Sequence, residues 1–428
     1  MTNAVSAKMN GLNFISSVVY EVPVKGKRTE YILDIGRLIE SNKLIVSSSD
    51  RCIRIIDATT QVVCTSLFGH GSTVSCIVPS RTSSSVVFSS GLDNAVIMWD
   101  ERVSHKPFRK IKLPGEVNSV TVSNNDTMIA AAVEQDISIY DVRKLKDNGN
   151  SSKLFFYDEM HSDTVTNLAF SSKLPHLLMS GAEDGLICLS DTTIQDYDES
   201  TSSILNTDCP VRRFGFYGST QDGVYSLATV ETASFWDHPN AQRIANLSSL
   251  REDHNIEYLV DCFESETSVM LLGGRYDGRG SVFRLEGATV TPYTCLEHGH
   301  TDTIRCALYA DFGTQNVLFT GGEDGKLLAW KSGGDENGVR HDEDKIEDQT
   351  HDDNIEQRAD QVDQEVLHRA HVMDCGEHSA HEENREYDGD GGEVLGKRHA
   401  HDDSEGEIIR KKKKKHKKHS RDKHGNEV

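Results

Sequence analysis

The chain has 428 residues, of which 36% are hydrophobic and 27% charged, a composition too polar for a single compact globule of this length. The formal net charge of −22 is uneven, with −12 on residues 1–331, −18 on residues 332–409 and +8 on residues 410–428. An acidic body excludes the wrapping of nucleic acid by the main domain, and the lack of an apolar run of about 18 residues excludes a membrane-spanning helix.

In chain order, short apolar strands recur with a period of about 45 residues. Each copy leads from a turn of small or acidic residues into an apolar stretch, and seven copies are recognisable, the sixth of them degenerate. Period-two alternation with turn residues between the stretches predicts strands and no substantial helix. The copies span residues 46–57, 89–100, 130–141, 180–191, 226–237, 272–285 and 320–331.

Two residue types mark these copies. The chain has only three tryptophans, Trp99, Trp236 and Trp330, and all three occupy the same place in the repeat. These repeats resemble the WD-repeat family over about residues 12–332, which implies an all-β fold, a seven-bladed β-propeller of four-stranded blades. A histidine followed by an alternating strand precedes three copies, at His70, His161 and His300.

The resemblance implies buried structural hydrogen-bond sets in three blades. Because the same residue types recur at the same spacing in three repeats, we assign them a structural role rather than that of a hydrolase triad, and we expect no enzyme activity, metal, cofactor or small-molecule substrate. In the set that contains His161, Ser190 stands in the tryptophan position, so that set is incomplete. The sets are His70, Ser89, Asp93 and Trp99; His161, Ser180 and Asp184; and His300, Thr320, Asp324 and Trp330.

The two ends of the repeat region complement each other. The last repeat supplies three strands and no outer strand, while residues 14–22 form a strand without a blade. We therefore expect the N-terminal strand to complete the last blade and close the ring. Two polar insertions, residues 143–156 and 195–203, are interpreted as loops.

Beyond the propeller, residues 333–409 are acidic and residues 410–428 are basic, and we expect both segments to be disordered. The basic run resembles a nuclear import signal, so we expect a nuclear, or nucleolar, protein that contacts an import receptor or RNA through this run, with a cytoplasmic pool as an alternative. The alternative is a solvated run that folds back on the acidic segment. Its residues are Arg410, Lys411, Lys412, Lys413, Lys414, Lys415, Lys417 and Lys418.

The ends of the second and third repeats carry a further resemblance. Trp99-Asp-Glu-Arg102 and Tyr140-Asp-Val-Arg143 resemble the Trp/Tyr-Asp-x-Arg pattern of propellers that act as substrate receptors of cullin-RING ubiquitin ligases. The resemblance implies that Arg102 and Arg143 contact the ligase adaptor, although Glu101 departs from the apolar residue usual there.

Among WD-repeat families, residues 180–186, 235–237 and 319–331 resemble the WD repeat-containing protein 89 family. We expect a non-enzymatic scaffold that binds protein partners through its propeller faces in the nucleus, without membrane attachment. Two alternatives stay open: a substrate receptor of a cullin-RING ligase, and a nuclear or nucleolar factor associated with ribosome assembly or RNA.

Overall fold

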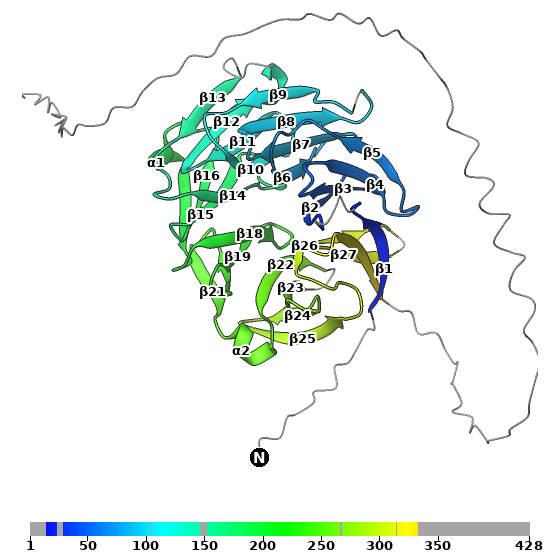
Figure 1. Ribbon diagram of the computed structural model, residues 1–428. Coiled ribbons are helices and arrows are strands. Elements are labelled where there is room, and N and C mark those ends of the chain that lie inside the picture. Colours follow the sequence, from blue (N-terminus) through cyan, green and yellow to red (C-terminus); the bar gives the residue numbers. More distant parts are fainter. Residues whose placement is uncertain are drawn as a thin grey trace, which may run out of the picture. The chain divides into compact units, whose positions relative to one another are not determined.

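Seven four-stranded antiparallel sheets follow one another around a ring (Figure 1). The computed structural model describes residues 14–23, 29–103, 105–145, 152–265, 268–313 and 315–332, so the predicted acidic and basic tails lie outside the described residues. The predicted all-β, seven-bladed propeller is confirmed. We number the sheets as blades 1 to 7, each running from an inner strand at the channel to an outer strand at the periphery.

The blades use consecutive strands, and only blade 7 borrows one from the start of the chain. Blade 1 contains β2 (Ile32–Arg37), β3 (Lys43–Ser48), β4 (Ile53–Asp57) and β5 (Val63–Leu67); blade 2 contains β6 (Val74–Pro79), β7 (Val86–Gly91), β8 (Ala95–Asp100) and β9 (Arg109–Lys112). Blade 3 contains β10 (Val117–Val122), β11 (Met128–Val133), β12 (Asp136–Asp141) and β13 (Lys153–Tyr157); blade 4 contains β14 (Val165–Phe170), β15 (Leu177–Ala182), β16 (Leu186–Asp191) and β17 (Thr201–Asn206). Blade 5 contains β18 (Val211–Tyr217), β19 (Gly223–Ala228), β20 (Ala233–Asp237) and β21 (Gln242–Leu247); blade 6 contains β22 (Tyr258–Glu264), β23 (Val269–Gly274), β24 (Gly280–Glu286) and β25 (Thr289–Leu296); blade 7 contains β26 (Ile304–Asp311), β27 (Asn316–Gly322), β28 (Lys326–Ser332) and β1 (Phe14–Glu21).

The N-terminal strand closes the ring as the sequence predicts. β1 pairs antiparallel with β28, and Phe14 lies opposite Ser332 while Glu21 lies opposite Lys326. In Figure 1 the blue β1 lies beside the yellow strands of the last blade. Both ends of the described chain therefore share one sheet, and β1 covers the edge of β28 that would otherwise be unpaired.

The hydrophobic core is divided among the seams between blades. Each of the seven buried clusters in the described residues joins side chains from two neighbouring blades. The cluster at the closure, for example, packs Val19 and Phe319 of blade 7 against Ile32 and Val46 of blade 1. A blade therefore cannot bury its own apolar faces, and the ring is the smallest unit that can.

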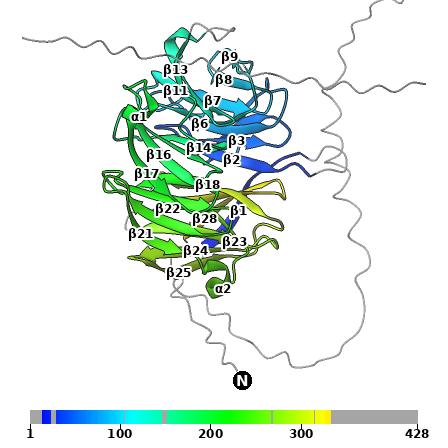
Figure 2. The same ribbon diagram turned by 90° about the vertical axis from the view of Figure 1, so that its left-hand side faces the viewer.

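Helical structure is confined to short pieces. They are α1 (Tyr197–Ser200), α2 (Leu250–His254) and a 3-10 turn at Val142–Lys144. α1 lies beside β16 and β17 at the outer rim of blade 4 (Figure 2). Within the described ranges, none of these helices has the length and apolar character needed to cross a membrane.

The prediction that residues 143–156 and 195–203 form loops is only partly correct. The insertion at 143–156 contains the start of β13, and the insertion at 195–203 contains α1 and the start of β17. β13 and β17 are outer strands with one exposed face, which gives them a polar composition like that of a loop. Their pairing with β12 and β16 is therefore not evident from the sequence.

Candidate functional site

Antiparallel blades place their connecting loops on two opposite faces. Loops that lead into an inner strand, or join the second strand to the third, lie on one face, which we name the His face because His70 and Asp93 lie there. Loops that join the first strand to the second, or the third to the fourth, lie on the other face. We name this the Arg face because Arg102 and Arg143 follow the third strands of blades 2 and 3.

In blade 2 the structure brings the four predicted residues together. His70 lies between Asp93 and Ser89, with Nδ1 2.8 Å from Asp93 Oδ1 and Nε2 2.8 Å from Ser89 Oγ. Trp99 Nε1 donates to the same Ser89 hydroxyl at 2.8 Å. Because the carboxylate can only accept, Nδ1 carries the imidazole proton and Nε2 accepts from Ser89.

Blade 7 repeats this geometry with threonine in place of serine. His300 Nδ1 is 3.0 Å from Asp324 Oδ1, and His300 Nε2 is 2.8 Å from Thr320 Oγ1. Trp330 Nε1 donates to Thr320 Oγ1 at 2.7 Å. In both blades the carboxylate also accepts the backbone N–H that follows the histidine, from Gly71 and Thr301, so it fixes the loop that enters the inner strand.

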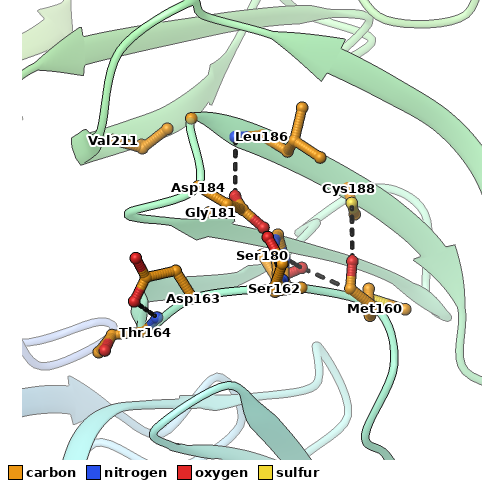
Figure 3. Close-up of polar contacts among 12 residues, drawn as sticks. Met160, Ser162, Asp163, Thr164, Ser180, Gly181, Asp184, Leu186, Cys188 and Val211 are labelled. Carbon is orange, nitrogen blue, oxygen red and sulfur yellow. Dashed lines mark hydrogen bonds and ion pairs between the residues drawn. The ribbon is translucent and has the colours of Figure 1, made fainter.

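Blade 4 keeps the histidine, serine and aspartate but replaces the tryptophan. His161 Nε2 is 2.8 Å from Ser180 Oγ, and Asp184 accepts the backbone N–H of Ser162 at 3.0 Å. Asp184 also accepts the backbone N–H of Leu186 at 2.9 Å (Figure 3). The Met160 sulfur lies 3.5 Å from Ser180 Oγ and 3.6 Å from Ser190 Oγ. Sequence reasoning placed Ser190 alone at the tryptophan position, whereas Met160 occupies the space between the two hydroxyls.

The histidines of blades 2 and 4 are held neutral and the aspartate of blade 2 is held ionised, the states that their structural hydrogen bonds require. Desolvation lowers the pKa of His70 and His161, which keeps both imidazoles neutral. Desolvation opposes ionisation of Asp93, but the hydrogen bonds from Gly71 and His70 hold its pKa below the usual value. Ser89, Ser180 and Thr320 are at most 1% exposed, so a substrate cannot reach their hydroxyls. These groups therefore lack the access that nucleophilic catalysis needs.

In blade 1 an arginine and a serine, rather than a histidine, bind the aspartate of the loop between the second and third strands. Arg54 Nη2 donates to Asp50 Oδ2 at 2.6 Å, and the Ser48 hydroxyl donates to Asp50 Oδ1 at 2.6 Å. These bonds hold the pKa of Asp50 at about 2 despite its desolvation. Sequence reasoning missed this set because Arg54 lies on the third strand, four residues after Asp50, and not at the histidine position of the other blades.

Arg102 and Arg143 occupy equivalent positions on the Arg face of neighbouring blades. Arg102 donates from Nε and Nη2 to Asp100 at 2.9 and 2.7 Å, and Arg143 donates in the same way to Asp141 at 2.9 and 2.9 Å. The arginine side chains remain 65% and 73% exposed, whereas both aspartates are almost fully buried. The guanidinium groups are thus held in one orientation and presented to solvent.

The inner strands share a feature that sequence reasoning missed. Every inner strand has a β-bulge near its start, and the residue after the bulge is in turn Asp34, Cys76, Ser119, Asn167, Arg213, Asp261 and Cys306. We name these seven residues the channel ring. Their types differ from blade to blade, so no repeated letter in the sequence marks them.

Side chains at the bulge also connect neighbouring blades. Ser75 Oγ donates to the carbonyl of Val117 at 2.5 Å, and Thr166 Oγ1 donates to that of Val211 at 2.7 Å. Asn118 reaches Val165 and Arg212 reaches Leu259 in the same way. Each acceptor is the first or second residue of the next inner strand, so the polar channel lining contributes to the spacing between blades.

Within the described chain, no group of three or more histidine, cysteine, aspartate or glutamate side chains could hold a metal ion. The Cys76 thiol in the channel has a pKa raised to about 12, chiefly by desolvation, so it is protonated at neutral pH.

The family model described as WD domain, G-beta repeat matches residues 61–100, 153–191 and 291–331. These are the three segments that contain His70, His161 and His300 with their hydrogen-bond sets. The chain contains WD repeats and folds as a seven-bladed β-propeller. The resemblance predicted from its sequence is therefore confirmed.

Three similar proteins each align with at least 71% of this chain. The chain is 27% identical over 330 residues to the WD repeat-containing protein 89 homolog of Dictyostelium discoideum, covering 74% of this chain and 88% of that protein. It is 28% identical over 328 residues to WD repeat-containing protein GTS1 of Arabidopsis thaliana, covering 71% and 82%. It is 22% identical over 316 residues to Denticleless protein homolog A of Xenopus laevis, covering 71% of this chain and 41% of that one.

Proposed function

We propose that this WD-repeat propeller is a non-enzymatic platform that binds protein partners in the nucleus. Its serine, threonine, histidine and aspartate groups that resemble catalytic sets are buried and engaged in structural hydrogen bonds. What the ring offers to other molecules is therefore its two loop faces and its channel, which suits recognition better than catalysis.

The observation that carries this proposal is the pair of arginines on the Arg face. Arg102 and Arg143 repeat one geometry in two adjacent blades, and a buried aspartate restricts each side chain before any partner arrives. Arginine is one of the residue types enriched at the energetic centres of protein interfaces, and preorganisation of its side chain lowers the entropic cost of binding. A surface that binds through both guanidinium groups would present carboxylates or backbone carbonyls to them.

The same pair supports a more specific candidate, a substrate receptor of a cullin-RING ubiquitin ligase. Both arginines follow the Trp/Tyr-Asp-x-Arg pattern that such receptors use toward their adaptor, and both lie on one face. Glu101, the departure from that pattern, is nearly buried and pairs with Lys43 of blade 1 at 2.7 Å. Its charge is thereby compensated within the propeller, so it does not oppose an adaptor that approaches Arg102.

Affinity purification followed by mass spectrometry tests this function. We compare the wild-type chain with the Arg102→Ala/Arg143→Ala variant and with Arg279→Ala as a matched control. Arg279 is also exposed and donates to an aspartate two residues earlier, Asp277, but it lies on the His face. We expect the double variant to lose partners that the control retains.

The outcomes distinguish the general proposal of a protein-binding platform from the more specific one of a ligase substrate receptor. Partners lost by the double variant, with a ligase adaptor among them, support the receptor. Partners lost without an adaptor support the platform and contradict the receptor. Equal recovery of all partners by the three proteins contradicts a role of the Arg face.

The nuclear part of the proposal rests on the basic run at 410–418, which lies outside the described residues. Imaging a chain that lacks residues 410–421 tests it, because unchanged nuclear accumulation would contradict the assignment. Purification with and without ribonuclease tests the ribosome- or RNA-associated alternative, which requires partners that disappear when RNA is digested.

A further inference from the structure

The channel contains a cavity of about 450 Å³ that is lined from all seven blades. Its walls include the channel-ring residues Asp34, Ser119, Asn167, Arg213 and Asp261, and polar groups outnumber apolar ones. The ring lies near the start of each inner strand, and inner strands begin at the His face. The cavity is therefore closer to the His face than to the arginines on the opposite face.

All but one of the charged side chains that line this cavity have a partner of opposite charge. Arg213 Nη1 lies 2.5 Å from Asp261 Oδ2, and the Tyr225 hydroxyl donates to Asp261 Oδ1 at 2.9 Å. Arg212 donates to the Leu259 carbonyl and lies 3.9 Å from Glu231 Oε2. The two arginines of the cavity are thus neutralised by two acids.

Asp34 is the exception. It accepts the backbone N–H of Ile35 at 3.0 Å and, more weakly, that of Ile77 at 3.4 Å. Among the residues that the structure describes, no cation forms an ion pair with it. The cavity, counted with Glu231, therefore carries one negative charge that the propeller leaves uncompensated.

An uncompensated carboxylate in this place is costly for the fold. Asp34 is half-buried, because it faces the cavity while protein surrounds it, and this desolvation raises its pKa. Arg213 lowers that pKa and Asp261 raises it, and the neighbouring thiols of Cys76 and Cys306 are protonated at neutral pH because burial raises their pKa. A bound cation would offset the cost, as partners do for other buried charges.

We propose that the channel receives a lysine or arginine side chain of a bound protein partner, with Asp34 as its counter-charge. The inference rests on the proposed platform function and adds a second contact on the face opposite Arg102 and Arg143. Ser119 and Asn167, which lie 3.3 Å apart at Oγ and Oδ1, line the same cavity with neutral polar groups. One unpaired carboxylate among neutral groups suits a single organic cation better than a metal ion, which takes several charged or oxygen ligands.

Titration calorimetry with the full-length chain tests this contact. The probes are the peptide acetyl-Gly-Arg-Gly-amide, its lysine counterpart, and a citrulline counterpart that keeps the shape of arginine without its charge. We expect the charged peptides to bind with a Kd of about 1 mM and the citrulline peptide to bind at least about tenfold more weakly. Absence of binding by both charged peptides at about 10 mM overturns the proposal.

Three variants test whether Asp34 is the counter-charge of the bound peptide. Asp34→Asn should weaken binding of the charged peptides at least about tenfold, whereas Asp34→Glu should retain it because the charge remains. Asp302→Asn is the matched control, since Asp302 is exposed in the loop that enters β26 on the same face and does not line the cavity. Binding that survives Asp34→Asn overturns the proposal.

Thermal stability without peptide separates recognition from a structural role. Because the Asp34 carboxylate is destabilising in the unliganded fold, Asp34→Asn should raise Tm at neutral pH. A lower Tm for Asp34→Asn than for wild type overturns the inference that Asp34 binds a cation of a partner.

Purified complexes separate this inference from the platform function. Partners recovered equally by wild type and Asp34→Asn contradict the channel contact alone, and recovery of no partner by either protein contradicts the platform itself.

Discussion

At the scale of single residues, this propeller uses buried ion pairs and hydrogen bonds to hold loops in place. Asp93 accepts from the imidazole of His70 and the backbone of Gly71, and its side chain is 8% exposed. A buried carboxylate with several donors fixes a loop more strongly than apolar contact can, because its donors are unsatisfied if it moves.

Replacing this carboxylate should therefore cost more than replacing one that lacks a histidine partner. We expect Asp93→Ala to lower the free energy of unfolding by about 3 kcal/mol, since it leaves the His70 and Gly71 N–H groups without their acceptor. Asp136→Ala, at the start of β12 in blade 3, is the control, because desolvation and the nearby Asp158 and Glu134 disfavour that carboxylate. Equal losses in chemical denaturation would contradict the role given to Asp93.

The buried histidines predict how stability depends on pH. The pKa of His70 and His161 is lowered by desolvation from the usual 6.5, so the fold favours their neutral form. Their contribution is complete above pH 6.5; below that pH the unfolded chain binds protons first, so the contribution falls and is lost in full once pH reaches the lower folded value. Asp93 and Asp324 have lowered pKa values as well, so they add a further loss at pH below 3.8. Tm should fall steadily between pH 6.5 and pH 4 in a thermal series, and a rise on acidification would contradict this assignment.

At the scale of elements, the closing strand carries much of the stability of the ring. Val19 of β1 is 4% exposed and packs in the cluster that joins blade 7 to blade 1, whereas Ile15 of the same strand is 65% exposed. Val19→Ala should lower the free energy of unfolding by about 2 kcal/mol, and Ile15→Ala should leave it nearly unchanged.

Removal of residues 1–24 should abolish cooperative unfolding. A stable, cooperatively folding truncated chain would show that β1 does not close the ring.

Some elements could be predicted from the sequence and others could not, for physical reasons. The second strands β7 and β11 are buried on both sides, so their apolar runs are plain in the sequence. The outer strands β13 and β17 expose one face and follow polar insertions, which gives them the composition of loops. The His70, His161 and His300 sets could be named in advance because one residue type recurs. The channel ring could not, because each blade contributes a different side chain.

At the scale of the whole molecule, the placement of the core at the seams makes the ring one cooperative unit. Because every cluster joins two blades, loss of one blade exposes the apolar faces of its neighbours. Trp99, Trp236 and Trp330 report on blades 2, 5 and 7, and all are buried. Fluorine NMR of 5-fluorotryptophan-labelled protein should therefore show one common midpoint of thermal unfolding. Separate midpoints would mean that the blades divide into independent bodies.

The central claim is that the propeller binds a protein partner through the face that carries Arg102 and Arg143. Lysines are distributed on both faces, with Lys144 and Lys173 on the Arg face and Lys110 and Lys326 on the His face. Cross-linking mass spectrometry of the purified complex measures directly which of them lie beside the partner. The account predicts that Lys144 and Lys173 form cross-links to the partner; cross-links confined to Lys110 and Lys326 would contradict it.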